Sequence, residues 1–132
     1  MIPLGLRDTF VSARKQAAKR QIQWSLSDAD LQRLFERSKG RCEVSGIEFD
    51  WALWRTGQRR PWAASIDRID SSGSYTLENC RLVCVAANLA MNEWGTSVLY
   101  RLARAVVESR ERYRPSAGKK PNGLLSRARD GA

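Results

Sequence analysis

Side chains that suit a hard cation follow one another in the centre of the chain. Asp67 and Asp70 close a short β-type run, a Ser/Gly turn comes next, and Asn79 and Asn88 follow, Asn88 within a helix-like segment. Carboxylate and amide oxygens are the ligands that an ion such as Mg²⁺ prefers. One reaction that needs such an ion is phosphodiester hydrolysis, in which the cation stabilises the transition state and another group takes a proton from water.

The stretch Trp62 to Gly95 resembles the HNH endonuclease family, in the form common in phages and mobile elements. The motifs that carry this resemblance are Ser65-Ile66-Asp67-Arg68-Ile69-Asp70, Tyr75-Thr76-x-x-Asn79 and Val83-Cys84-x-x-x-Asn88. The resemblance implies a metal-dependent DNA endonuclease or nickase. It also implies that Asp67 and Asn88 bind Mg²⁺ or Mn²⁺, that Arg68 occupies the position of the general base, and that Asn79 braces the loop and orients that base.

The chain departs from the family in one respect, because it contains no histidine. Arg68 keeps its proton at neutral pH, so it can clamp a phosphate but cannot act as a base. Water could instead lose its proton to bulk solvent or to Asp70, or Tyr75 or Glu78 could accept it. Alternatively the protein is inactive as an enzyme and binds nucleic acid, or binds a partner protein as a phage-encoded inhibitor. The sequence leaves these alternatives open.

The cysteines predict no structural zinc. Many family members bind zinc through two Cys-x-x-Cys pairs, whereas here Cys42 and Cys84 each stand alone, with Ser45 and Ala87 at the second positions. Two thiolates without histidine cannot complete a tetrahedral zinc site. We expect the cysteines to be small buried groups that lie near each other.

Charge favours a nucleic-acid partner. The net charge is +9, and the central residues 41–95 (net −1) lie between basic flanks, 1–40 (+4) and 96–132 (+6). This distribution suits a protein that holds a cation centrally and grips a polyanion with its ends. Trp51 and Trp54 either contact nucleic acid or fill the core. The predicted nucleic-acid contacts are Arg14, Lys15, Arg55, Arg59, Arg60 and Arg68.

The resemblance implies an α+β protein built on a small ββα-metal core, to which the residue pattern adds a β-hairpin and flanking helices. Residues 6–22 and 28–38 read as helices, the second starting with a capping box at Ser27. A change of period predicts hairpin strands at 42–44 and 47–49. The resulting regions are a basic helical region (1–40), the HNH-like core (41–95), a helix packed on the core (96–114) and a disordered basic tail (115–132).

The sequence contains no run of 18 apolar residues and no secretion signal, so we expect no membrane span. The expected location is the cytoplasm, which for a phage protein means that of the bacterial host. A homodimer is one arrangement that would let a single small site cut both strands of DNA.

Overall fold

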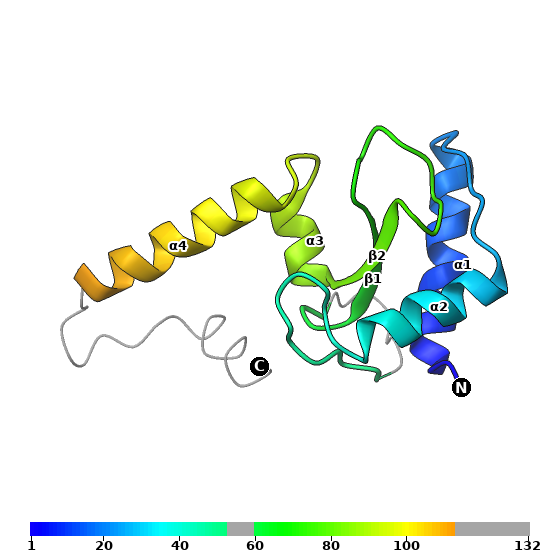
Figure 1. The fold of residues 1–132 in the computed structure, drawn as a ribbon, viewed down its shortest axis with the longest axis horizontal. Helices are drawn as coiled ribbons and strands as arrows, with labels where there is room; N and C mark the ends of the chain where they lie inside the picture. Colours follow the sequence, from blue (N-terminus) through cyan, green and yellow to red (C-terminus); the bar gives the residue numbers. More distant parts are fainter. Residues whose placement is uncertain (53–59, 113–132) are drawn as a thin grey trace. The chain divides into compact units, whose positions relative to one another are not determined.

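The computed structural model describes residues 1–52 and 60–112, and contains four helices and two strands there (Figure 1). In chain order the elements are α1 (Leu4–Lys19), α2 (Asp28–Ser38), β1 (Ala64–Arg68), β2 (Cys80–Cys84), α3 (Val85–Met91) and α4 (Thr96–Arg112). Residues Met1–Leu99 form one compact unit, and a second begins at Tyr100. The α+β class predicted from the sequence is confirmed.

The two N-terminal helices form where the sequence predicts them. In α1, Leu6, Phe10 and Ala17 are buried at helical spacing, whereas Val11 is exposed. In α2 the Ser27 side chain accepts a hydrogen bond from the Asp30 amide, and the Asp30 carboxylate accepts one from the Ser27 amide. This capping box satisfies two amides that the first helical turn leaves without partners, and it confirms the predicted start.

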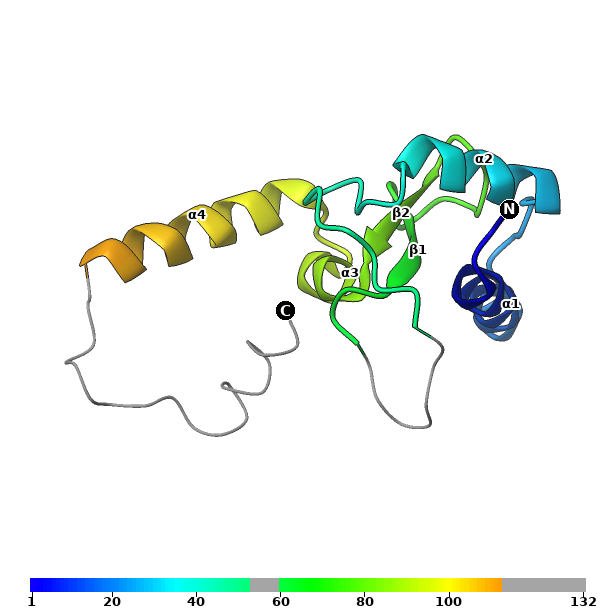
Figure 2. The same ribbon diagram turned by 90° about the horizontal axis from the view of Figure 1, so that it is seen from below.

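The strands and α3 follow directly on one another, in the order ββα. Strand β1 pairs antiparallel with β2, with Ala64 opposite Cys84 and Arg68 opposite Cys80. In this two-stranded sheet β1 has a partner on one side only, so its outer edge is open. Figures 1 and 2 both place the sheet between α3 and α1.

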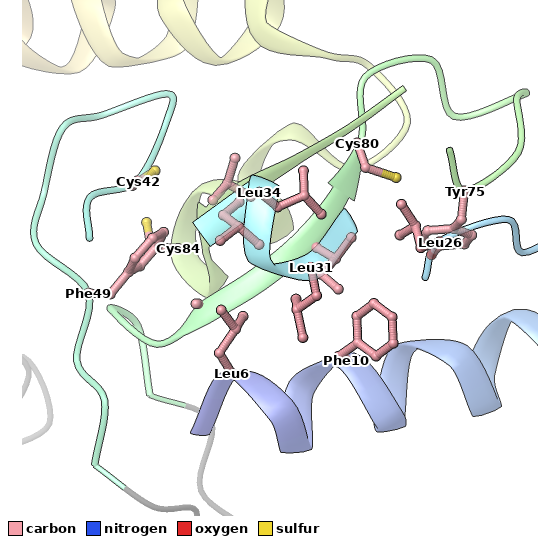
Figure 3. Packing of buried hydrophobic residues seen from close by; sticks show 14 of the residues in the cluster. Leu6, Phe10, Leu26, Leu31, Leu34, Cys42, Phe49, Tyr75, Cys80 and Cys84 are labelled. Atoms are coloured by element: carbon pink, nitrogen blue, oxygen red, sulfur yellow. The ribbon is translucent and has the colours of Figure 1, made fainter. Parts of the chain in front are cut away.

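The core lies mainly between the sheet and the two N-terminal helices (Figure 3). Leu6, Leu34, Leu82 and Val83 are almost completely buried in it. Trp51 packs against this core and meets Phe49 and Phe35 edge-on, with ring centroids 5.2 and 5.9 Å apart. Trp51 therefore fills the core, and Trp54 lies outside the described residues.

The prediction of hairpin strands at 42–44 and 47–49 is wrong. These residues form a turn closed by a single antiparallel bridge between Arg41 and Glu48. Some local pairing does form, since the Cys42 amide donates to the Ile47 carbonyl at 2.9 Å and the Phe49 amide donates to the Gly40 carbonyl at 3.0 Å. Glu43 is bound to β2 instead, because its amide donates to the Leu82 carbonyl at 2.9 Å and its carboxylate accepts from the Leu82 amide at 2.6 Å.

The buried Cys42 and Cys84 lie side by side, as expected, with their sulfur atoms turned toward each other (Figure 3). The S–H of Cys84 and the Ser45 amide both donate to the Cys42 sulfur, which lowers the pKa of Cys42. The third thiol, Cys80, is buried apart from this pair, and burial raises its pKa to about 11.

The last helix, α4, has nearly the predicted bounds. Its first-turn residue Leu99 packs against the core, and packing of the rest of the helix on the core stays a prediction, as does the tail at 115–132, which lies outside the described residues. No helix in the described ranges is both long and apolar enough to cross a membrane.

Candidate active site

A cleft of about 420 Å³ runs along the open edge of β1. Its walls come from the end of α1, from residues 65–68 of β1, from the loop after β1, and from α3 with the turn that follows it. Asp67, Arg68 and Asn88 all line this cleft. Three side chains that the sequence assigned to one site are therefore brought together.

Asp67 is a carboxylate that the fold buries, although a charged group is more stable in water. The residue is 7% exposed, and its Oδ2 accepts a hydrogen bond of 2.9 Å from Nε of Arg81, directly opposite on β2. Burial raises the pKa of Asp67, although the guanidinium groups of Arg81 and Arg68 act in the opposite direction. The described residues donate no hydrogen bond to its other oxygen, Oδ1.

A short chain of hydrogen bonds orients the side chain of Asn88. Ser65 Oγ donates to the Val83 carbonyl at 2.9 Å, and Asn88 Nδ2 donates to Ser65 Oγ at 3.1 Å. A hydroxyl has one proton, and here a carbonyl that can only accept takes it. Ser65 must therefore accept from Asn88, so the amide nitrogen faces Ser65 and the amide oxygen faces the other way.

These two side chains fit a hard divalent cation. Ser65 and Asp67 are two residues apart on one strand, so they lie on the same face, about 7 Å apart. The Asn88 amide, anchored at Ser65, and Oδ1 of Asp67 thus supply two oxygen donors from one cleft. Mg²⁺ commonly takes one or two protein ligands and completes its shell with water and phosphate. Arg81 is the one unfavourable neighbour, since it already holds the second oxygen of Asp67.

Arg68 is held in the cleft by the loop that follows β1. Its Nη1 donates to the Gly73 carbonyl at 2.7 Å, and its guanidinium carbon lies 5.1 Å from the centre of the Tyr75 ring. The remaining N–H groups of the guanidinium can meet an anion in the cleft.

Asn79 braces this loop and does not itself line the cleft. Its oxygen accepts from the Asp70 amide at 2.9 Å, and its nitrogen donates to the carbonyls of Asp70 and Ser74 at 3.0 and 2.9 Å. A Cβ at Gly73 would come within 2.8 Å of the Asn79 nitrogen, so the loop fits closely around this amide. The bracing part of its predicted role agrees with these contacts.

The alternative bases differ in where they lie. Asp70 is committed to the turn, because its Oδ1 accepts from both the amide and the hydroxyl of Ser72, and these bonds lower its pKa. Glu78 is exposed and does not line the cleft, whereas Tyr75 does.

Three of the other predicted nucleic-acid contacts, Arg14, Lys15 and Arg60, do not line the cleft. Arg14 and Lys15 are exposed on α1, and Arg55 and Arg59 lie outside the described residues. Arg60 forms an ion pair of 2.8 Å with Asp50, and its Nη2 donates to the Ala52 carbonyl. Contact of these five residues with nucleic acid stays a prediction.

Two cleft residues were missed from the sequence, Arg20 and Glu93. Arg20 follows α1, and the segment after it is fastened to the loop by Tyr75, whose amide donates to the Gln23 carbonyl and whose carbonyl accepts from the Ser25 amide. Glu93 lies in the turn after α3. Neither residue belongs to the three motifs that carry the family resemblance. Arg20 reaches the cleft only through the contact between its segment and the loop at Tyr75, which the sequence alone does not show.

Comparison with known proteins gives one structural likeness. No protein-family model matches the chain, and no curated protein matches it. The solved structure of the rare-cutting HNH restriction endonuclease PacI, which is described as perturbing DNA, superimposes with a TM-score of 0.58 at 17% sequence identity. The likeness covers 79% of this chain and 78% of PacI. It shows that the chain has an HNH-endonuclease-like fold.

Proposed function

We propose that this protein is a metal-dependent DNA endonuclease or nickase that hydrolyses phosphodiester bonds, of phage or mobile-element type. Oδ1 of Asp67 and the amide oxygen of Asn88 would hold Mg²⁺ or Mn²⁺. When bound, such an ion stabilises the charge that develops on the phosphate and on the leaving oxygen.

The remaining cleft residues would bind and position the substrate. Arg68 donates to a non-bridging oxygen of the scissile phosphate while the Gly73 carbonyl holds its other side. Arg20, at the end of the cleft formed by the residue after α1, would bind a neighbouring phosphate, since arginine contacts to phosphates fix the position of a protein on its nucleic acid. Asn79 keeps the loop in the shape that holds Arg68.

The observation that supports this proposal most strongly is the fixed orientation of the Asn88 amide. A protein that only binds DNA has no need to turn an amide oxygen away from Ser65, on the strand face that also carries a buried carboxylate. Carboxylates whose pKa is raised by burial in a cleft, as that of Asp67 is, are common at catalytic sites. The HNH-like fold and the basic flanks agree with DNA as substrate.

The test is nicking of supercoiled plasmid by the purified protein in Mg²⁺, in Mn²⁺ and in EDTA. We expect nicking that requires the metal and is lost in Asp67→Ala. Asp28→Ala, which removes an exposed carboxylate on α2, should nick like the wild type.

A second candidate function is that of a catalytically inactive protein that binds nucleic acid or inhibits a partner. Two observations favour it: the chain has no histidine to act as a base, and the ion pair with Arg81 competes with a cation for Asp67. If wild type and Asp67→Ala are equally silent with every metal and both still shift DNA on a gel, this second function replaces the first.

A further inference from the structure

The proposed hydrolysis leaves one atom without an assigned destination, namely the proton of the attacking water. The chain has no histidine, and a guanidinium cannot accept a proton at neutral pH. The acceptor must therefore be another group that reaches the cleft, or bulk solvent.

The residues that line the cleft leave few candidates for the proton acceptor. Among the described residues that line it, the only side chains able to accept a proton are Asp67, Tyr75 and Glu93. Asp67 is bonded to Arg81 and is assigned to the cation. Tyr75 is 8% exposed, lies against Trp24 with ring centroids 4.9 Å apart, and faces the Arg68 guanidinium. A neutral phenol is a poor proton acceptor, because it must lose its own proton before its oxygen can take one from water.

Glu93 is a carboxylate that is free to accept a proton, unlike Asp67 and Tyr75. It is an exposed carboxylate, and no described residue forms a hydrogen bond or ion pair with it. Its backbone is held close to the end of α3, because the Asn92 amide donates to the Asn88 carbonyl at 3.0 Å and the Trp94 amide donates to the Met91 carbonyl at 2.8 Å. Its position is thus tied to the helix that carries the proposed ligand Asn88.

We propose that Glu93 is the catalytic proton acceptor, and that it takes the role of a histidine from a different position in the fold, since Arg68 stands where the family's base would be. The inference rests on the proposed nuclease function. A water oxygen gives an electron pair to phosphorus while its proton passes to the Glu93 carboxylate. The bond from phosphorus to the leaving oxygen breaks with its electron pair, that oxygen takes a proton from solvent, and Glu93 returns its own proton to solvent.

The test compares Glu93→Gln and Glu93→His with the wild type in single-turnover nicking between about pH 6 and about pH 9. The charged or titratable groups that share the cleft are Arg20, Asp67, Arg68 and Tyr75. With Glu93 as the acceptor, the wild-type rate should not follow the hydroxide concentration over this range. Glu93→Gln should lower the rate by about 10²-fold or more, and the residual rate should rise in proportion to hydroxide.

Glu93→His should restore activity with a titration near about pH 6.5, where imidazole loses its proton. Glu78→Gln is the matched control, since it removes an exposed carboxylate that does not line the cleft. Mn²⁺ affinity, measured without DNA, should be unchanged in every variant. DNA affinity in Ca²⁺ should rise slightly in Glu93→Gln, because a negative charge is lost.

The outcomes separate this inference from the proposed function. If the wild type nicks and Glu93→Gln nicks at the same rate with the same pH profile, Glu93 is not the acceptor and the nuclease function stands. If the wild-type rate already rises in proportion to hydroxide, bulk solvent is the acceptor and the inference is overturned. If the wild type does not nick at any pH, the nuclease function itself fails, and the role of Glu93 fails with it.

Discussion

Replacing Ser65 with alanine tests whether the orientation of the Asn88 amide matters for cation binding. In the wild type, the bond of 3.1 Å from Asn88 Nδ2 to Ser65 Oγ is possible only with the nitrogen toward Ser65. Ser65→Ala removes this preference, so the amide can turn and present its nitrogen to the cation. A hydrogen bond contributes about 0.5–1.5 kcal/mol net, which corresponds to about 2- to 12-fold in affinity.

The assay is Mn²⁺ binding in the absence of DNA, followed by the electron paramagnetic resonance signal of free Mn²⁺. We expect Ser65→Ala to weaken binding by that factor. Ser65→Thr keeps the hydroxyl and suits a strand, so it should bind close to the wild-type level. Ser72→Ala, which removes a hydroxyl bonded to Asp70 in the turn, is the matched control.

A double-mutant cycle with Asn88→Asp sharpens the test. A carboxylate has two equivalent oxygens, so its orientation does not need fixing, and Ser65→Ala should cost less affinity in that background. Equal losses in both backgrounds would refute the reasoning, because they would mean that Ser65 acts through general stability and not through the amide. Unchanged binding in Ser65→Ala alone would refute it as well.

Four further results are expected. Mn²⁺ at ten times its dissociation constant should stabilise the wild type by about 1.4 kcal/mol. In a unit of this size that raises the melting temperature by about 6–11 °C, whereas the melting temperature of Asp67→Ala should not change with Mn²⁺. Burial raises the pKa of Asp67, so protons should begin to displace Mn²⁺ at a higher pH than they would at an exposed aspartate. Stabilisation by Mn²⁺ that persists as the pH falls to the ordinary pKa of aspartate would contradict this. Arg20→Gln should weaken DNA binding and lower its salt dependence by about one phosphate contact, more than Arg14→Gln on α1 does; equal effects would remove Arg20 from the cleft contacts. Asn79→Ala should destabilise the fold by about 1–3 kcal/mol in urea unfolding, since it leaves loop amides and carbonyls unpaired, and a change below about 0.5 kcal/mol would show that the brace is dispensable.

Elements encoded by neighbouring residues were predictable from the sequence. The capping box at Ser27 and the stripe of buried residues in α2 depend on residues three and four apart, so periodicity locates them. The spacing of Asp67, Asn79 and Asn88 was equally informative, because β1, one loop, β2 and α3 follow one another within a single short stretch of the chain.

What the sequence did not reveal depends on contacts between distant segments. The residues 42–49 were predicted to form hairpin strands, but they form a turn in which the Glu43 amide donates to the Leu82 carbonyl. The ion pair between Arg60 and Asp50 was not predicted either, while DNA contact by Arg60 stays a prediction. Glu93 follows a short helix in a turn whose direction is set by Asn92 at a positive φ of 47°, a conformation that side-chain type indicates only weakly.

The open edge of β1 has a consequence for the behaviour of the protein at high concentration. An unpaired strand edge is a template on which a second chain can add a strand, and natural sheets oppose this with charged side chains. Asp67 is buried and paired with Arg81, so Arg68 is the charge of β1 that can oppose such pairing. At the start of the strand the edge is partly covered, because the Thr9 hydroxyl of α1 donates to the Ala64 carbonyl at 3.4 Å. Preparations of Arg68 variants should therefore be checked for aggregates by light scattering before a change in their activity is attributed to lost phosphate contacts.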